Sequence, residues 1–250
     1  MELRADKIVV FGGGSGIGKA IAKRLVSAGA TVTIVGRTES KLINAAKEIG
    51  KNVYYIPFDI ANCNGHNNVF LKAAKLMGGL NGFVNSAAIG LESYLNRGYE
   101  PFDITPEEWD AVNNVNYKAA FFLMRNEILY LREHTEKSNI LNIASNAACM
   151  DITGSYGAAK LDMIKWTKAL GKRNGKYGII INGIAPGATV TDMIASYAED
   201  ENAPYERHAI GRFIKPGEIA ELAYYLMSNY GEIICGHTVV ADGGDSSATL

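Results

Sequence analysis

Short apolar runs alternate with longer amphipathic runs along most of the chain, and this alternation constrains the fold more than any other feature. The first apolar run is KIVVF (7–11), and the run after it places Ile17, Ile21 and Leu25 at helical spacing before Gly29. Further strand candidates follow at 31–35, 52–56, 82–85, 139–145, 178–184 and 237–241. Continuous apolar strands separated by helices predict a parallel sheet that is buried on both faces.

No internal repeat, low-complexity tract or Pro/Ser-rich linker divides the 250 residues. A chain of this length buries enough surface to fold without disulfides or a structural metal. We therefore expect a single-domain, Rossmann-like α/β fold over residues 1–250, in which a doubly wound parallel sheet carries helices on both faces. In such a sheet, ligands bind beyond the carboxyl ends of the strands.

Charge and cysteine content argue against several classes of partner. The formal net charge is −1 and no five like charges are consecutive, so we expect neither nucleic-acid nor membrane binding. The three cysteines and four histidines are scattered, which predicts no metal site and no disulfide framework. The charged N-terminus lacks a secretory signal, and no apolar run is long enough to span a bilayer, so a reducing cytoplasm is the expected location.

A glycine-rich turn joins the first strand to the first helix. Gly12, Gly16 and Gly18 have the spacing GxxxGxG, which differs from the common GxGxxG. Residues without a Cβ let backbone N–H groups approach a pyrophosphate, and the helix N-terminus adds partial positive charge. The turn therefore predicts a dinucleotide site, although a plain strand–helix turn would carry the same glycines.

The end of the second strand indicates which dinucleotide is bound. An NAD site usually carries an acidic residue there, but this chain has Gly36 followed by Arg37 and Thr38. A guanidinium and a hydroxyl suit a 2′-phosphate, which favours NADP(H) over NAD(H). The alternative is that Arg37 is an ordinary solvated surface residue.

Tyr156 and Lys160 are four residues apart at the start of a helical run, SYGAAK, so their side chains share a face. An ammonium beside a phenol favours the phenolate, and we expect it to lower the pKa of Tyr156. Such pairs also occur by chance in a tyrosine- and lysine-containing chain. Their position downstream of the strand candidate that ends at Ser145 is what makes them candidates for acid–base chemistry.

Several segments, in order, resemble the short-chain dehydrogenase/reductase family over essentially the whole chain. They are GGGSGIG (12–18), FDI (58–60), NSAAIG (85–90), EEWDAVNNVN (107–116), NIAS (142–145), YGAAK (156–160), APGATVTDM (185–193) and ADGG (241–244).

The resemblance implies a role for each matching residue. Tyr156 would donate a proton to a substrate carbonyl or accept one from an alcohol, Lys160 would lower its pKa and hold the nicotinamide ribose, and Ser145 would hydrogen-bond the reacting oxygen. Asn116 would keep a water behind Lys160, although a helix kink could also explain it. The implied cofactor contacts, besides Tyr156 and Lys160, are Gly12, Gly14, Ser15, Gly16, Ile17, Gly18, Arg37, Thr38, Asp59, Ile60, Asn85, Ala87, Pro186, Gly187, Thr189 and Thr191. Asp59 could instead be a turn or capping residue, and the two threonines plain loop hydroxyls.

The chain departs from the family pattern in three places. Phe11 stands where the family carries Thr, so packing must hold the glycine turn. The usual Asn-Asn-Ala-Gly reads Asn-Ser-Ala-Ala at 85–88, and the added Cβ of Ala88 is expected to move the nearby loop. Only 11 positions separate Ser145 from Tyr156, fewer than is common in the family, and Asn146 is the alternative polar contact at this place.

The expected function is an NADP(H)-dependent oxidoreductase that interconverts a carbonyl and a secondary alcohol. Segments 90–105, with Tyr94, Tyr99 and Phe102, and 188–213, with Tyr197 and Tyr205, are expected to form an apolar pocket for a ketone or alcohol, the second as the substrate loop. The alternatives are a non-catalytic NADP(H)-binding sensor or scaffold, and a nucleotide-sugar epimerase or dehydratase, which usually needs a larger C-terminal domain. The resemblance also implies a homo-oligomer, a tetramer or a dimer.

Overall fold

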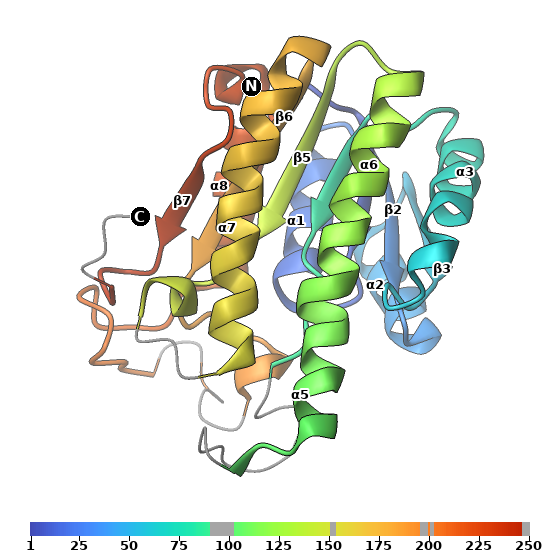
Figure 1. Cartoon of the computed structure of the whole chain (residues 1–250). Coiled ribbons are helices and arrows are strands. Elements are labelled where there is room, and N and C mark those ends of the chain that lie inside the picture. The colour runs from blue at the N-terminus through green and yellow to red at the C-terminus, as the bar shows by residue number, and fades with distance from the viewer. Residues whose placement is uncertain (91–102, 151–153, 196–199, 201–202, 247–250) are drawn as a thin grey trace.

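The structure is a computed structural model that describes residues 1–90, 103–150, 154–195, 200 and 203–246. Its strands form one parallel sheet in the order β3-β2-β1-β4-β5-β6-β7 (Figure 1). The strands are β1 (Lys7–Phe11), β2 (Thr31–Gly36), β3 (Val53–Pro57), β4 (Gly82–Asn85), β5 (Ser138–Ile143), β6 (Ile179–Pro186) and β7 (Thr238–Ala241). The predicted doubly wound sheet is confirmed, and the chain reverses its direction across the sheet between β1 and β4, where such folds bind their ligands.

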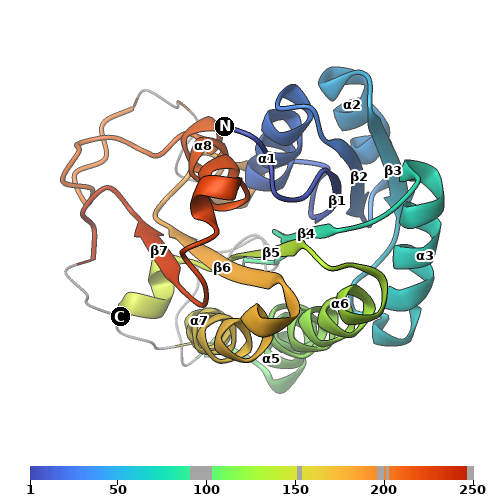
Figure 2. The same cartoon turned by 90° about the horizontal axis from the view of Figure 1, so that it is seen from above.

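Helices cover both faces of the sheet (Figure 2). One layer contains α1 (Gly16–Ser27), α2 (Glu39–Ile49) and α8 (Pro216–Leu226). The other contains α3 (His66–Met77), α6 (Ala120–His134) and α7 (Ser155–Asn174), with the short α5 (Pro106–Asn113) leading into α6. Between α5 and α6 the chain forms a π-helical turn, Asn114–Ala119, so the two helices are continuous.

Two apolar layers hold the helices to the sheet. In the first, Val10 and Ile34 of the sheet pack with Ile21 of α1 and Ile219 of α8. In the second, Phe11 packs on α3, where its ring lies 6.3 Å from that of Phe70 at a steep angle. Phe11 is completely buried, so packing holds the start of the glycine turn, as the sequence predicts for this departure from the family.

A buried polar chain crosses this second layer. Asn85, the last residue of β4, donates from Nδ2 to Glu127 Oε2 of α6 and to Asn142 Oδ1 of β5, both at 2.9 Å. Asn142 in turn donates to Thr167 Oγ1 of α7 at 2.9 Å. Glu127 has no solvent exposure, and burial raises the pKa of its carboxyl to about 8.

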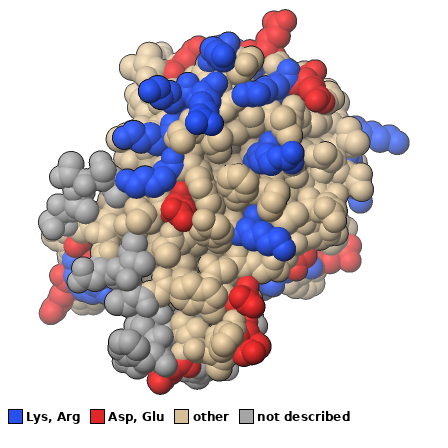
Figure 3. Space-filling model, in the orientation of Figure 1, with Lys and Arg blue, Asp and Glu red and all other residues tan. Residues whose placement is uncertain are grey.

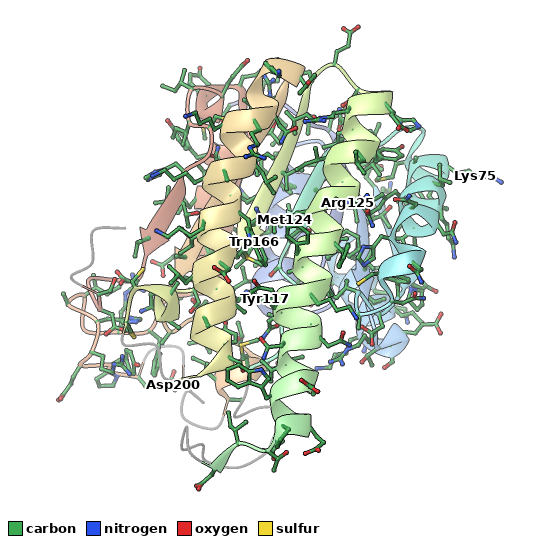
Figure 4. All side chains as sticks on the ribbon, viewed as in Figure 1. Lys75, Tyr117, Met124, Arg125, Trp166 and Asp200 are labelled. Atoms are coloured by element: carbon green, nitrogen blue, oxygen red, sulfur yellow. The ribbon has the colours of Figure 1, made fainter. Side chains whose placement is uncertain are left out.

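Aromatic side chains form an exposed strip on the α6–α7 face. Tyr117 and Trp166 lie between these helices (Figure 4), with their ring centroids 5.0 Å apart, and Phe121 contacts Trp166 at 5.2 Å. Phe122 lies next to them, and Tyr117, Phe121 and Phe122 are about two-fifths exposed. On the same face, Lys and Arg gather over the upper part of the helices, with Asp and Glu mainly near the lower edge (Figure 3).

None of the helices in the described part of the chain is long and apolar enough to cross a membrane.

Candidate active site

A cleft of about 590 Å³ opens beyond the carboxyl ends of the strands. It contains every predicted site residue except Asn85 and Asn116. The predicted residues that line it are Gly12, Gly14, Ser15, Gly16, Ile17, Gly18, Arg37, Thr38, Asp59, Ile60, Ala87, Ser145, Tyr156, Lys160, Pro186, Gly187, Thr189 and Thr191. Residues from seven separate segments therefore meet in one place.

The glycine turn forms a cradle that side chains would fill. Gly12 has a φ of +77°, and a Cβ there would lie 2.7 Å from the backbone nitrogen of Ala87. Gly16 has a φ of +52°, and a Cβ on Gly18 would lie 2.3 Å from the carbonyl oxygen of Gly12. Ser15, the N-cap of α1, makes no side-chain bond to the first turn, so the helix N-terminus keeps donors for an anion. This geometry fits the diphosphate of a dinucleotide.

The residues at the end of β2 line the adjoining part of the cleft. Arg37 is exposed and forms no ion pair with any described residue. Lys41, four residues later on α2, lines the same cleft and pairs with Asp192 at 2.7 Å. No local signal identifies Lys41 in the sequence, because Arg37 precedes α2 and helical spacing does not relate the two side chains.

Asp59 and Ile60 follow β3 and line the same end of the cleft. Asp59 Oδ1 accepts a bond from the backbone N–H of Ala61 at 3.0 Å, so this side chain also has the turn role considered for it. Ile60 is buried, and its carbonyl contacts His66 Nε2 at 2.8 Å. The local structure therefore fixes both residues without a ligand contact.

Ser145, Tyr156 and Lys160 meet at the other end of the cleft. Ser145 lies two residues beyond the end of β5, not in the strand as the sequence predicts, and its hydroxyl is hydrogen-bonded to Tyr156. The hydroxyl also caps a 3-10 turn at 146–149 by accepting from Ala147 N at 3.2 Å. The short spacing to Tyr156 thus does not keep the two hydroxyls apart.

Lys160 lies under the tyrosine and is almost completely buried. Its Nζ is 5.7 Å from the Tyr156 ring centroid and donates to the Ile143 carbonyl at 2.8 Å. Burial lowers the pKa of Lys160 to about 8, because the charged form loses solvation.

The expectation that the ammonium lowers the pKa of Tyr156 is wrong for this structure. Burial raises the pKa of this phenol, and the hydrogen bond from Ser145 only partly offsets that effect. Lys160 directs its ammonium to a backbone carbonyl instead of the phenolic oxygen. The phenol therefore keeps its proton at neutral pH.

Asn116 lies in the π-helical turn and is 1% exposed. Its side-chain amide accepts from Ile89 N at 3.0 Å and donates to Ile89 O at 2.7 Å. The oxygen and the nitrogen of this amide therefore both hold the backbone after β4, which agrees with a structural role for the side chain. Asn85, similarly, directs its amide into the buried polar chain with Glu127 and not into the cleft.

The segment after β6 also lines the cleft. Gly187 N donates to Ala241 O of β7 at 3.1 Å, and Thr189 Oγ1 donates to Gly187 O at 2.9 Å. His208 ties a later segment to this one, because its Nε2 accepts from Ala188 N at 3.2 Å while its Nδ1 contacts Arg212 O at 2.8 Å. Thr189 thus has an internal bond, whereas Thr191 makes a close approach to the glycine cradle at Gly16.

The substrate end is described only in part. The predicted pocket residues Tyr94, Tyr99, Phe102 and Tyr197 lie outside the described residues. Cleft residues that sequence reasoning did not assign include Ser86, Ile89, Met150, Arg207 and Asp245. Arg207 and Asp245 carry no recognisable motif, so only the fold brings them to Ser145.

Comparisons with known proteins agree with this geometry. A family model described as enoyl-(acyl carrier protein) reductase matches residues 12–246. The chain is 30% identical over 249 residues to a 2,5-dichloro-2,5-cyclohexadiene-1,4-diol dehydrogenase of Sphingobium indicum, with 97% of this chain and 98% of that protein covered.

Solved structures resemble it over nearly their full length. A 3-ketoacyl-(acyl-carrier-protein) reductase of Brucella melitensis complexed with NADH has a TM-score of 0.85 and 28% identity, covering 96% of this chain and 97% of the other. A short chain dehydrogenase of Burkholderia cenocepacia in complex with NADP has a TM-score of 0.83 and 30% identity, covering 95% and 96%. Similar proteins thus bind either nicotinamide dinucleotide.

Proposed function

Because this chain belongs to the short-chain dehydrogenase/reductase family, and is therefore an oxidoreductase that uses a nicotinamide dinucleotide, we propose that it interconverts a carbonyl and a secondary alcohol with NADP(H). The observation that carries the proposal is the contact of Ser145 with Tyr156 above a buried Lys160, in the same cleft as the glycine cradle. Family membership also argues against the non-catalytic sensor or scaffold considered from the sequence.

In the direction of reduction, Tyr156 is the proton donor. Its raised pKa keeps the phenol protonated at neutral pH, so the proton is available to a carbonyl oxygen beside it. Ser145, bonded to the same hydroxyl, orients the substrate oxygen toward it. A bound nicotinamide supplies the hydride, or accepts it in the direction of oxidation. Lys160 keeps its charge below about pH 8 and donates to the Ile143 carbonyl, so a cation lies 5.7 Å from the Tyr156 ring centroid.

Tyr156→Phe tests the proton-donor role. We expect turnover of NADPH with a panel of ketones to fall at least about 100-fold, because a general acid contributes roughly that much, while NADPH binding followed by fluorescence stays within about twofold. Tyr230→Phe is the matched control, since that tyrosine is 64% exposed and lies outside the cleft. Full turnover by the Tyr156 variant would remove it from the mechanism.

The preference for NADP(H) rests on Arg37, whose guanidinium forms no ion pair within the described part of the chain, and Lys41 adds a second cation to the lining of the same cleft. A charge-assisted bond to a 2′-phosphate is worth about 1.5–3 kcal/mol, or roughly 10- to 100-fold in affinity. We expect Arg37→Asp to shift the ratio of kcat/KM for NADPH over NADH by at least that factor. The exposed Arg173 on α7 gives the control Arg173→Asp. An unchanged ratio would contradict the assignment.

The substrate is a ketone or secondary alcohol with an apolar body. Met150, Met193, Ile194 and Tyr205 line the cleft and support this class. Among its relatives, the Sphingobium enzyme is named for a ring diol and the Brucella enzyme for a ketoacyl group. A panel that contains cyclic ketones and acyl thioester analogues distinguishes these two shapes.

We also propose that the enzyme is a homo-oligomer in the cytoplasm. The exposed aromatic strip of Tyr117, Phe121, Phe122 and Trp166 supports a second copy packing on the α6–α7 face. All three cysteines are free, which suits a reducing compartment. Phe121→Lys should shift the sedimentation coefficient toward that of the monomer, and an unchanged coefficient would place the contact elsewhere.

A further inference from the structure

A polar wall lies next to Ser145 on the substrate side of the cleft. Asn146, which is buried, donates from Nδ2 to Asp245 Oδ2 at 3.0 Å. The other carboxylate oxygen of Asp245 lies 3.5 Å from Nε of Arg207. Arg207 Nη2 also contacts the Met150 sulfur at 3.4 Å. These four side chains all line the cleft, and they come from three segments that are far apart in the sequence, so the tertiary fold builds this wall.

The contacts leave one edge of the Arg207 guanidinium available. Asp245 faces its Nε edge, and the Asp245 side chain is only 9% exposed. A thioether is a weak acceptor, so the Met150 contact does little to satisfy Nη2. Nη1 has no partner among the described residues, and the Arg207 side chain is 61% exposed. A planar guanidinium that is oriented through Nε presents two parallel donors to a planar anion.

We propose that Arg207 binds a carboxylate carried by the substrate, and that Asp245 is a positioning residue that orients the guanidinium. The inference rests on the proposed function and narrows its substrate class to keto acids and hydroxy acids. It also amends the expectation of a wholly apolar substrate, because the hydrocarbon part contacts Met150 and Tyr205 while the acid group lies at Arg207.

The charges in this wall fit a monoanion. Each carboxylate oxygen of Asp245 has a partner, the Asn146 amide for one and Nε of Arg207 for the other. The carboxylate therefore does not face the available edge of the Arg207 guanidinium. One cation with one bidentate edge complements a carboxylate, whereas a dianionic phosphate would need further donors. Of the acids Glu199, Asp200 and Glu201 in the segment 188–213, Glu199 and Glu201 lie outside the described residues.

Matched pairs of ketones test the proposal. Each pair contains an acid and its neutral amide, for example levulinate with levulinamide and oxocyclohexanecarboxylate with oxocyclohexanecarboxamide. We expect wild type to prefer the acid, and Arg207→Gln to lower kcat/KM for the acid at least about tenfold, mainly through KM, while the amide changes less than about twofold. Arg207→Lys keeps the charge without the fork and should lose less, and the exposed Arg173→Gln should change neither substrate.

Calorimetric binding of each acid and amide, with NADP present, separates this inference from the proposed function. Acid binding that depends on Arg207 but gives no turnover would support the carboxylate site and count against the proposed reaction. If wild type and Arg207→Gln both turn over the acid and the amide, and the acid has the same kcat/KM in the two proteins, the carboxylate site is overturned and the proposed reaction stands. Absence of an acid preference in every pair, in binding as in turnover, would also overturn it.

Discussion

Replacing Glu127 by Gln should remove a large pH dependence of stability. The carboxyl is completely buried on α6, one oxygen accepts from Asn85 Nδ2 at 2.9 Å, and the other has no hydrogen-bond partner among the described residues. Burial raises the pKa of Glu127 from 4.5 to about 8, so the folded protein holds a proton that the unfolded chain releases. The group therefore contributes its full stability below pH 4.5, and that stability is lost as the pH rises toward 8.

The slope follows from proton linkage. One proton held by the folded state but not by the unfolded state costs about 1.4 kcal/mol per pH unit. From the ordinary pKa of a glutamate to the raised one, the loss accumulates to roughly 5 kcal/mol, and it levels off above pH 8. Glutamine is neutral throughout and nearly isosteric, so its variant lacks this slope.

Urea denaturation at several pH values between 4.5 and 8.5 measures the effect. We expect the free energy of unfolding of Glu127→Gln to exceed that of wild type by an amount that grows with pH. Glu133→Gln is the control, because Glu133 is an exposed acid on the same helix. If the wild-type and Glu127→Gln profiles run parallel across this range, the buried carboxyl is not protonated in the folded protein and the reasoning is refuted.

Three further substitutions test the frame of the site. Gly18→Ala places a Cβ 2.3 Å from the Gly12 carbonyl, so dinucleotide affinity measured by fluorescence titration should fall more than about tenfold; unchanged affinity would mean that the cradle adjusts freely. Phe11→Thr restores the family residue but deletes a buried ring, so it should lower the free energy of unfolding by about 2–4 kcal/mol, and a stabilised variant would contradict the packing account. Asn116→Ala breaks both bonds to Ile89 and should speed amide exchange at Ile89 beyond the change seen at the protein's other buried amides; equal exchange would remove its structural role.

The alternation of apolar and amphipathic runs predicts the sheet correctly, because strands buried on both faces leave a strong local signal. Its error at β5 is instructive. Residues 139–145 read as one strand, but the ladder ends at Ile143, and Ser145 then caps a short turn. The sequence shows which residues are apolar, but a partner strand decides where pairing stops.

Local reasoning also limits what can be said of the site. Motifs identify Ser145, Tyr156 and Lys160, because each follows a strand or lies at the start of a helix. They do not identify Arg207 and Asp245, whose relation to Ser145 arises only when the chain folds. The predicted direction of the Tyr156 pKa shift is wrong for a similar reason. Burial raises this pKa, and the Ile143 carbonyl holds the Lys160 ammonium, and both are features of the tertiary structure.

The pair of hydrogen bonds between Asn116 and Ile89 has a geometric consequence. A side-chain amide has the same donor–acceptor pair as a peptide unit, so Asn116 bonds the backbone of Ile89, beyond the end of β4, as the peptide of a neighbouring strand would. These bonds depend on the rotational position of Asn116: inserting one residue between it and α6 would turn the amide by about 100° around the helix axis. The π-helical turn at Asn114–Ala119 sets this rotational position, so the helix and the segment that leaves β4 are matched to each other.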